Sequence, residues 1–359
     1  MKKIKNSFGG VIGGLVLLVA GTILLWWNEG NNVKNIKTVA EVEKIVIDVE
    51  SDKINNENEG KLIATNGAMK VEGNVTDETF KVSVNSAKLS RVVEIYEWDE
   101  NCTTDDDGDE TCSYSKGWED HIINSSSFKE SSRYQNPTSM PYYGEDYVNY
   151  NVTMGAFSLT KDQVSSMNTN ATFNVTSDNT ISGYHVDGNY VTNSKDLSHA
   201  EVGDIRISFK YNDWANVSVM AVQKGNSFEN FVSEAGKTVN RVEEGNLSSK
   251  VMIEHMVSEN NMIKWLCRAG GAFLIIMGYL ALLKPICTIL SFIPMLGNLV
   301  GGAISIAAFL VGLIHALLVI AIAWFRFRPI LSIVLIVIII GLIIGLKKLS
   351  NKSKTKNNS

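Results

Sequence analysis

Hydrophobic residues are concentrated at the two ends of this 359-residue chain. One uncharged apolar run, Val11–Trp27, lies at the N-terminus, and the others fall between Ala269 and Leu346. The long segment between them is polar and rich in Asn, Asp, Ser and Thr. An α-helix rises about 1.5 Å per residue, so about 20 apolar residues cross a hydrocarbon core of about 30 Å. The pattern predicts a large water-facing domain held by membrane-spanning helices at both ends, and it excludes most classes of soluble enzyme.

The N-terminal run has two interpretations. Lys2, Lys3 and Lys5 precede it, which is also how a secretory signal peptide begins. However, the run ends in Trp26–Gly30, which contains no small-residue cleavage site, and a Trp pair is typical of the membrane interface. We therefore expect a retained anchor, transmembrane helix 1, over residues 9–27, after a cytosolic N-terminus of residues 1–8.

The C-terminal quarter contains apolar runs long enough for further spans. We place transmembrane helices 2, 3 and 4 at residues 265–284, 299–324 and 329–346, with breaks at Pro285, Pro294 and Pro329. Helix 2 is short unless Arg268 extends its charged end toward the lipid headgroups. Residues 285–298 then form either a cytosolic loop or a re-entrant segment, and residues 347–359 form a basic cytosolic tail.

The distribution of basic residues orients these spans. Four spans leave both termini on one face of the membrane. The Lys-rich ends of the chain place that face toward the cytosol by the positive-inside rule. The central domain is then lumenal or extracytoplasmic. The short basic link Arg326–Pro329 lies on the outer face in this arrangement and runs against the rule.

The central segment, residues 28–226, alternates polar and apolar residues in short stretches bounded by Asn, Asp, Gly or Ser, which is typical of strands and turns. Strands are predicted at Lys44–Val49, Lys81–Val84, Val92–Trp98, Ile205–Tyr211 and Val217–Val222. Residues 227–264 instead carry apolar residues at steps of three and four, which predicts an amphipathic helical lead-in to helix 2. This lead-in either lies on the membrane surface or packs on the β-rich domain.

The expected fold class is therefore an α+β membrane protein. It has four transmembrane helices, one N-terminal and three C-terminal, and a large β-rich extramembrane domain between the first and the second. The net charge is −5 and the basic residues of the large domain are not clustered, so no nucleic-acid partner is expected.

Motif content narrows the function classes further. The sequence has no Gly-x-Ser-x-Gly motif, phosphate-binding loop or dinucleotide-binding fingerprint. None of its five histidines has a second histidine or a cysteine pair at the spacing of metal ligands. We therefore expect no catalytic residues, no cofactor and no metal site.

Cys102 and Cys112 flank an acidic turn that contains Asp107-Gly108, and aromatic residues lead into and out of it, which indicates a β-hairpin. A disulfide across this hairpin is expected if the domain faces an oxidising compartment. The loop 103–111 offers carboxylates to Ca²⁺, but Thr103 takes the first ligand position of an EF-hand and no Glu closes the loop. A solvated acidic turn is the favoured interpretation.

Polar and small residues inside the spans also have two interpretations. His315 lies among Leu and Ala within helix 3, where an ionisable residue indicates a function such as conduction. Alternatively, a neutral His315 is hydrogen-bonded to Ser305, Ser332 or a backbone carbonyl and holds helices together. Small-residue steps that predict close helix packing, within one bundle or between protomers, occur at Gly9, Gly10, Gly13, Gly14, Gly301 and Gly302.

Several blocks of the sequence resemble, in their order, the transmembrane protein 43 family, also called LUMA. They are Leu24–Gly30, Ser90–Trp98, Asn136-Pro137 with Met140-Pro141, Gly155–Leu159, Gly203–Ile207, Trp265 with Arg268–Gly271, Ile293–Gly297 and Ala321–Pro329. The resemblance covers nearly the whole chain, and the shared order makes it specific. The acidic hairpin around Cys102 and Cys112 has no counterpart in it.

The resemblance implies four spans with cytosolic termini, in agreement with the charge-based topology. It implies the endoplasmic reticulum and inner nuclear membrane for a eukaryotic protein, or the cytoplasmic membrane for a bacterial one. It brings no catalytic residues. We therefore expect a multi-pass membrane scaffold whose partners are the lipid bilayer, further copies of itself and other membrane proteins. The alternatives are a pore or ion-channel component and a membrane-bound enzyme.

Overall fold

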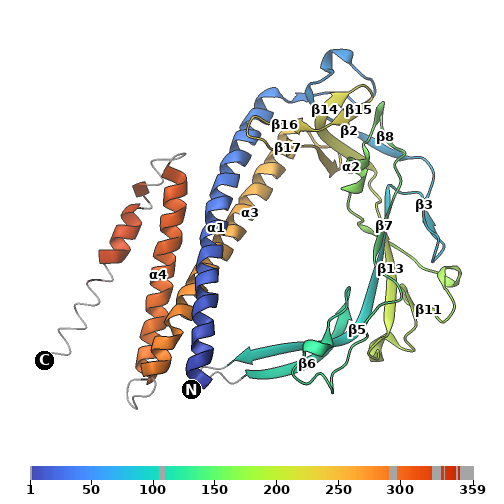
Figure 1. Ribbon diagram of the computed structural model, residues 1–359. Helices are drawn as coiled ribbons and strands as arrows, with labels where there is room; N and C mark the ends of the chain where they lie inside the picture. The colour runs from blue at the N-terminus through green and yellow to red at the C-terminus, as the bar shows by residue number, and fades with distance from the viewer. Residues whose placement is uncertain are drawn as a thin grey trace. The chain divides into compact units, whose positions relative to one another are not determined.

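A computed structural model gives the structure of the chain (Figure 1). It describes residues 2–104, 110–290, 297–325, 333–334, 336–344 and 347, with side chains over 10–103, 110–285 and 302–325 and the short C-terminal ranges. The chain divides into two compact units. The helical unit comprises Met1–Glu41, Glu234–Lys237 and Ile253–Ser359, and the β-rich unit comprises Val42–Ser233 and Thr238–Met252.

The helical unit contains the long helices α1 (Lys2–Ile45), α3 (Ser249–Leu290) and α4 (Gly297–Phe325). Within the described residues, three segments are long and apolar enough to cross a membrane: Gly10–Ile45, Ser249–Pro285 and Gly302–Phe325. The second contains the predicted helix 2, and the first and third cover all but the first residues of the predicted helices 1 and 3. The predicted fourth span, 329–346, falls partly outside the described residues and is not supported by the remainder, although residues 333–334 and 336–344 are helical.

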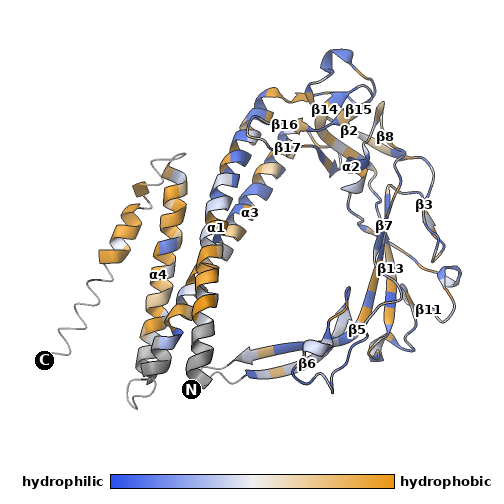
Figure 2. Ribbon diagram, in the orientation of Figure 1, coloured by the Kyte–Doolittle hydropathy of each residue, from blue (hydrophilic) through white to orange (hydrophobic). Residues whose placement is uncertain are grey.

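Helix α1 continues well beyond the predicted end of the first span. Its 44 residues correspond to about 66 Å at about 1.5 Å per residue, roughly twice the thickness of a hydrocarbon core. Figure 2 shows the apolar part of α1, and that of α3, giving way to polar residues along the same helix. The prediction that the β-rich domain begins at residue 28 was therefore wrong. Hydropathy marks the end of the apolar stretch, whereas the helix persists to Ile45.

Helix α3 likewise passes through Pro285, which was predicted to end the second span. A proline inside a helix removes one backbone donor, and membrane helices tolerate this when neighbouring groups satisfy the freed carbonyl. The predicted loop 285–298 is helical up to Leu290 and again from Gly297, and residues 291–296 lie outside the described part. The structure therefore does not test whether the loop is re-entrant.

The β-rich unit is built from short strands and one short helix, α2 (Lys161–Ser165). The strands are β1 (Ile47–Asp48), β2 (Leu62–Val71), β3 (Val75–Asp77), β4 (Val82–Val84), β5 (Lys88–Thr104), β6 (Glu110–Glu119), β7 (Glu145–Val148), β8 (Val152–Met154), β9 (Phe157–Ser158), β10 (Ala171–Phe173), β11 (His185–Asp187), β12 (Tyr190–Thr192), β13 (Ile205–Tyr211), β14 (Asn216–Lys224), β15 (Ser227–Glu229), β16 (Phe231–Val232), β17 (Thr238–Val239) and β18 (Arg241–Glu244).

Among the described residues these strands form two seven-stranded sheets and two small hairpins. The first sheet has the order β15-β14-β2-β8-β9, with β1 parallel to β2 and β18 antiparallel to β14. The second has the order β11-β12-β13-β5-β6, with β10 on β13 and β7 on β5. Each sheet buries its own apolar cluster, one around Ile63, Phe157 and Val219 and the other around Phe80, Ile95 and Phe209.

The stretches that were predicted as strands from alternating polar and apolar residues coincide with or adjoin observed strands. Ile205–Tyr211 is β13 without change, and the other predicted stretches fall on or beside β1, β4, β5 and β14. In β13 the alternation matches burial, because Ile205, Ile207 and Phe209 are buried and the residues between them are not. The predicted β-rich domain and its mixed α and β content are therefore confirmed.

The helical lead-in predicted over residues 227–264 was wrong in its first half. Strands β15 to β18 occupy residues 227–244, and only the part from Ser249 onward is helical. Gly225, Gly236 and Gly245 have φ of +58°, +76° and +93°, values that break a helix and permit tight turns. Apolar residues recur here at steps of three and four because turns separate very short strands. The spacing therefore combines residues of several strands and does not reflect a helix.

Candidate functional site

A buried ion pair joins α1 and α3 in the helical unit. Arg268 Nε donates to Glu29 Oε1 at 2.6 Å, and Arg268 Nη2 donates to Glu29 Oε2 at 2.9 Å. The Glu29 side chain is 0% exposed and that of Arg268 is 11% exposed. Two parallel hydrogen bonds match the planar guanidinium to the carboxylate and offset part of the cost of removing both charges from water.

Two tryptophan rings complete the surroundings of Arg268. Its guanidinium carbon lies 4.8 Å from the ring centre of Trp265 on α3 and 4.8 Å from that of Trp324 on α4. A cation over an aromatic face gains about 0.5–2 kcal/mol, with the larger values for desolvated sites. The extension of Arg268 toward the headgroups, which the sequence suggested as a way to lengthen helix 2, is not what the structure shows. Arg268 is held by groups from α1, α3 and α4 together.

Glycines allow α1 and α3 to approach each other closely. A side-chain carbon at Gly21 would lie 2.7 Å from the backbone oxygen of Gly271, and one at Gly14 would lie 2.8 Å from that of Gly278. On each helix the two glycines are two turns apart, so they lie on one face. On the same faces Leu25, one turn after Gly21, and Ile275, between Gly271 and Gly278, are both 0% exposed and pack into the apolar cluster of the unit.

The same antiparallel register continues where the sequence becomes polar. Asn28, which is 1% exposed, donates its side-chain amide to the Lys264 carbonyl at 3.1 Å. Further along, Asn35 donates to the side-chain oxygen of Asn260 at 2.8 Å. These contacts form a helix seam that is lined by Gly and Leu in its apolar half and by Asn in its polar half. The ion pair lies at the change from one half to the other.

His315 on α4 connects to α1 and α3. Its Nε2 lies 3.3 Å from the Thr22 hydroxyl, and its Nδ1 lies 3.3 Å from the Tyr279 hydroxyl. The Thr22 hydroxyl donates its single proton to the Leu18 carbonyl at 2.7 Å, so it can only accept from His315. The ring therefore carries its proton on Nε2, and Nδ1 accepts from Tyr279. A directed chain of hydrogen bonds runs from α3 through His315 to α1.

The predicted partners of His315 differ from the observed ones. Among the described residues, Thr22 and Tyr279 meet its ring nitrogens, in place of Ser305 or a backbone carbonyl. Ser332, the other predicted partner, lies outside the described part. The sequence could not show this because Thr22 and Tyr279 belong to other spans, and their depths are set by the helix register.

Replacing His315 by leucine should destabilise the helical unit by about 1 kcal/mol, because interhelical hydrogen bonds in membranes typically contribute about 0.6–2 kcal/mol. Thr22→Val and Tyr279→Phe should each cost less. Combined with His315→Leu they should add almost nothing, since the hydrogen bonds of Thr22 and Tyr279 to His315 are then already lost. Unfolding of the purified chain in bicelles measures this. Strictly additive effects of the three changes would contradict the hydrogen-bond chain.

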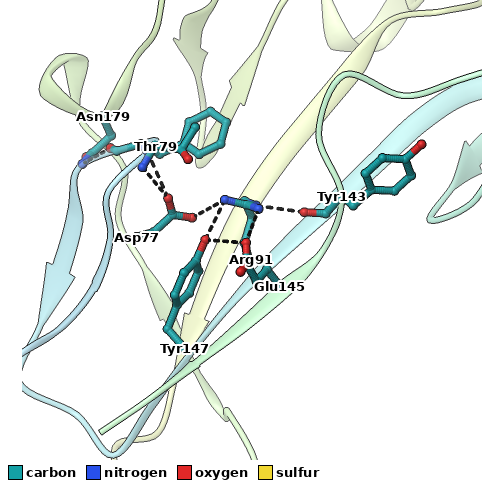
Figure 3. A network of polar contacts seen from close by, with 8 residues as sticks. Asp77, Thr79, Arg91, Tyr143, Glu145, Tyr147 and Asn179 are labelled. Carbon is teal, nitrogen blue, oxygen red and sulfur yellow. Dashed lines mark hydrogen bonds and ion pairs between the residues drawn. The ribbon is translucent and has the colours of Figure 1, made fainter.

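The β-rich unit contains a second buried charged network, around Arg91 on β5 (Figure 3). Arg91 donates to Asp77 Oδ2 at 2.7 Å, to Glu145 Oε2 at 2.8 Å and to the backbone oxygen of Tyr143 at 2.9 Å. The Tyr147 hydroxyl accepts from Arg91 and donates to Glu145, both at 2.8 Å. Burial, followed by this bond to Glu145, raises the pKa of Tyr147.

Asp77 shows what the Arg91 network holds together. Its side chain is 0% exposed, and its Oδ1 accepts the backbone N–H groups of Thr79 and Phe80, which closes the turn after β3. Arg91 thus ties the β3–β4 hairpin to β5 and β7 of the second sheet. The guanidinium donates four hydrogen bonds within this network, and its central carbon lies 5.6 Å from the ring centre of Phe80 and 5.8 Å from that of Tyr147, an arrangement that stabilises a fold.

Glu97 on β5 is a buried carboxyl group in which only one of the two oxygens accepts a hydrogen bond from the described residues. It is 0% exposed, and its Oε1 accepts the backbone N–H of Ile123 at 2.8 Å. Its Oε2 has no hydrogen-bond partner among the described residues. Burial is the main cause that raises the pKa of Glu97 above its ordinary value; the hydrogen bond from Ile123 and the nearby His121 oppose it, and Glu119 adds a small contribution in the raising direction.

This raised pKa predicts a dependence of stability on pH. The folded protein binds the Glu97 proton more tightly than the unfolded chain, whose Glu titrates near about 4.3. The contribution of Glu97 to stability is therefore complete below that value and is lost as pH rises through the folded pKa. Glu97→Gln should remove this part of the profile. Thermal unfolding of both proteins from pH 4 to 8 should show curves that converge or cross, and parallel curves would disprove the assignment.

Cys102 and Cys112 are paired residues of the β5–β6 hairpin, and a disulfide joins them. The predicted hairpin is present. Its turn, residues 105–109, lies outside the described part, so calcium binding by the loop 103–111 stays untested. Glu100 places a carboxylate oxygen within 4.8 Å of both sulfur atoms. With the sulfurs bonded to each other, neither is a thiolate that could bind a metal.

The glycines predicted to pack helices have mixed outcomes. Gly14 lies at a close helix contact, Gly10 approaches the Ala281 oxygen only to 4.0 Å, and Gly13 and Gly302 have no atom of the described structure within 4 Å of an added carbon. The environments of Gly9 and Gly301 lie outside the described side chains. The seam depends also on Gly21, Gly271 and Gly278, which the prediction left out. Their signal was the two-turn spacing within each span.

Comparison with known proteins places the chain in a family. The family model described as transmembrane protein 43 matches residues 95–329. The chain belongs to the transmembrane protein 43 family. Its human relative is 26% identical over 351 residues, which cover 92% of this chain and 87% of the relative, and the mouse protein gives the same values. The transmembrane protein 43 homolog of Drosophila melanogaster is 26% identical over 341 residues, 89% of each chain. No solved structure matches.

The family assignment makes the chain an integral membrane protein with a β-rich domain. Three of the sequence blocks that carry the resemblance meet at the ion pair: Leu24–Gly30 supplies Glu29, Arg268–Gly271 supplies Arg268, and Ala321–Pro329 supplies Trp324. A fourth, Ser90–Trp98, contains Arg91 and Glu97. Glu29 and Arg268 were recognised only as parts of motifs and not as a pair. Opposite charges at the same end of two antiparallel spans were the available signal.

Proposed function

We propose that the protein is a non-enzymatic multi-pass membrane scaffold that organises membrane protein complexes through its β-rich domain. The observation that carries this proposal is the helix seam. The β-rich segment is connected at both ends to α1 and α3, and these helices are held to each other by glycines, the Glu29–Arg268 pair and Asn contacts. Such a double connection suits a domain whose task is to present a surface, because both attachment points are fixed relative to one another.

The scaffold proposal includes a topology and a location. A fourth span over 329–346 would return the basic tail to the side of the N-terminus, which the positive-inside rule places in the cytosol. The β-rich domain then lies in the lumen of the endoplasmic reticulum and nuclear envelope of a eukaryote, or outside the cytoplasmic membrane of a bacterium. The Cys102–Cys112 disulfide supports an oxidising side for this domain.

Cross-linking of the tagged full-length chain in its native membrane, followed by mass spectrometry, tests the scaffold. The expected result is recovery of further copies of the chain and a reproducible set of membrane proteins cross-linked to residues of the β-rich unit. An Arg268→Ala variant should lose these partners, whereas Lys195→Ala, an exposed change in a loop of the second sheet, should keep them. A chain that remains monomeric and cross-links to no membrane protein would contradict the proposal.

Sidedness has its own test. An impermeant thiol reagent is applied to sealed vesicles before and after reduction. Cys102 and Cys112 should be labelled only after reduction and only from the lumenal or external side. Labelling of these cysteines from the cytosolic side would overturn the topology.

The pore alternative depends on His315. Both of its ring nitrogens are directed at side chains of neighbouring helices, which is the placement of a packing residue. Liposome flux assays decide between the two. Conductance that is altered by His315→Leu and unaffected by Thr22→Val would favour the pore over the scaffold.

A further inference from the structure

The outer part of the β5–β6 hairpin is a two-stranded ribbon that extends past the neighbouring strand (Figure 1). Strand β13 pairs with β5 only over Leu89–Ile95, whereas β6 pairs with β5 over Ile95–Thr104. A two-stranded hairpin on its own is only marginally stable in water. Here the Cys102–Cys112 disulfide joins the strands near the tip. The ribbon is therefore held in shape by a covalent bond where the sheet gives it no further strand.

A row of stacked side chains stabilises one face of the ribbon. Lys116 Nζ lies 5.1 Å from the ring centre of Trp98 and 5.8 Å from that of Tyr96. The rings of Tyr96 and Trp118 pack with their centres 5.2 Å apart, and the guanidinium carbon of Arg206 lies 4.5 Å from the ring centre of Trp118. Both cations of this row are thus directed onto aromatic rings of their own sheet, which is a favourable arrangement. Lys116 therefore does not project outward from β6.

The backbone of β6 has an unpaired outer edge. The Tyr96 N–H donates to the Asp204 oxygen at 2.8 Å, and the Trp98 N–H and C=O bond to the Asn136 side chain at 2.7 and 2.8 Å. The backbone groups of these two β5 residues therefore point away from β6. In an antiparallel pair the residues directly opposite such positions also point outward, in every second position along the strand. These outward residues of β6 are Cys112, Tyr114, Lys116 and Trp118. In the described part of the chain no strand pairs with this edge and no residue bonds to its N–H and C=O groups.

The surroundings of this edge are strongly acidic. Residues 99–120 carry nine carboxylates and a single basic side chain. On the face opposite the rings, the side chains of β6 are small at Ser113, Ser115 and Gly117, and the exposed Asp99 of β5 is paired with Ser115. A long basic side chain on a strand added to β6 can therefore cross Ser115 and reach the Asp99 carboxylate.

The same charges disfavour a second copy of the chain as the added strand. Antiparallel self-pairing about Ser115 would place Glu110 of one copy opposite Asp120 of the other, and self-pairing about Lys116 would place the two Lys116 residues opposite each other. Like charges that lie directly opposite on paired strands are destabilising. Charge complementarity therefore favours a basic strand over another copy of this acidic one.

We propose that the outer edge of β6 binds an extended basic segment of a partner protein by antiparallel β-strand addition. The backbone of the segment pairs with Cys112–Trp118. Every second residue is Lys or Arg and lies on the Ser115 face near Asp99, and the residues between are apolar and lie on the ring face. This inference rests on the proposed scaffold function, for which it names the class of partner.

A blocked peptide of alternating Arg and Val, long enough to span β6, is the probe. Its binding to the full-length chain in nonionic detergent is measured by fluorescence anisotropy. The expected result is saturable binding, weakened about tenfold or more when Glu replaces Arg. Absence of saturable binding, or equal binding of the Arg and Glu peptides, would overturn the proposal.

N-methylated peptides separate strand addition from charge attraction alone. In the proposed register the Val N–H groups point toward β6 and the Arg N–H groups point away from it. Methylation of the Val nitrogens should therefore weaken binding about tenfold, through loss of hydrogen bonds to the edge. Methylation of the Arg nitrogens should leave binding unchanged. Equal effects of the two methylated peptides would show that the backbone is not paired and would reject the site.

Variants of the chain test the same edge from the other side. Lys116→Pro removes one outward N–H and keeps the hydrogen bonds between β6 and β5, so it should weaken binding about fivefold. Lys116→Val loses the same charge but keeps the N–H, and should bind at least as well as the unchanged protein. Asp99→Asn should weaken binding severalfold, whereas Asp162→Asn, an exposed change on α2, should not. If Lys116→Pro fails to fold, the methylated peptides and Asp99→Asn still decide. Unchanged binding by both Lys116→Pro and Asp99→Asn would contradict the proposal.

Cross-linking in the native membrane distinguishes failure of this proposal from failure of the scaffold. Lys116→Pro should lose the membrane proteins cross-linked to β6 and keep the contacts between copies of the chain. No peptide binding, with all membrane partners retained by Lys116→Pro, would reject the β6 site and leave the scaffold intact. Peptide binding by a chain that cross-links to no membrane protein would reject the scaffold and leave the β6 site. Loss of self-association in Lys116→Pro without any peptide binding would assign the edge to a second copy and overturn the proposal.

Discussion

Replacing Arg268 by alanine should destabilise the helical unit by about 3–5 kcal/mol, the usual cost of removing one partner of a buried ion pair. The reason is the position of Glu29, whose side chain is 0% exposed and whose two oxygens both accept from Arg268. Without Arg268 the carboxylate keeps its desolvation cost and loses its compensation. The contacts of the guanidinium with Trp265 and Trp324 are lost as well.

A double-mutant cycle separates the pair from its surroundings. Glu29→Leu and Arg268→Leu should each cost about as much as Arg268→Ala. The double replacement Glu29→Leu with Arg268→Leu should recover most of the loss, because apolar residues of similar volume often replace a buried pair at little cost. Arg268→Lys should recover only part, since an ammonium cannot form the two parallel bonds. Unfolding in bicelles by steric trapping gives the free energies. Additive losses in the double variant would contradict a coupled pair.

The ion pair also illustrates which features the sequence could predict. The apolar runs and the alternating strands are local patterns, and they located α1, α3 and α4 and one or more strands in each sheet, among them β5, β13 and β14. Glu29 and Arg268 are separated by 239 positions in the chain. Their meeting depends on the relative register of two helices, which no local pattern contains. The topology did constrain it, because antiparallel spans place the end of the first and the start of the second at the same membrane face.

The two incorrect boundaries, at residue 28 and within residues 227–264, also arose because tertiary contacts are not visible in local sequence patterns. The boundary at residue 28 was set by the loss of hydrophobicity, yet α1 remains helical because α3 runs beside it and offers partners such as Asn260. Residues 227–244 were predicted to be helical from a spacing that short strands and glycine turns reproduce.

Substituting leucine for Gly21 or Gly14 should destabilise the pairing of α1 with α3 by about 2–3 kcal/mol, the upper part of the range for overpacking. An added carbon at Gly21 would lie 2.7 Å from the Gly271 oxygen, and one at Gly14 would lie 2.8 Å from the Gly278 oxygen. These neighbours are backbone atoms, so a side-chain rotation cannot relieve the contact and the helices must separate. Separation would in turn weaken the Glu29–Arg268 bonds in the same seam.

Neighbouring glycines provide the control for this prediction. Gly13 on α1 and Gly270 on α3 have no described atom within 4 Å of an added carbon. Leucine at either position should be neutral or stabilising by up to about 1 kcal/mol, because glycine is a poor helix former. Cysteine cross-linking between α1 and α3, together with unfolding in bicelles, should therefore distinguish Gly14→Leu from Gly13→Leu, although the two changes are chemically identical and adjacent. Equal losses at both would show that the substitution acts through the lipid-facing surface, and the close helix contact would then be wrong.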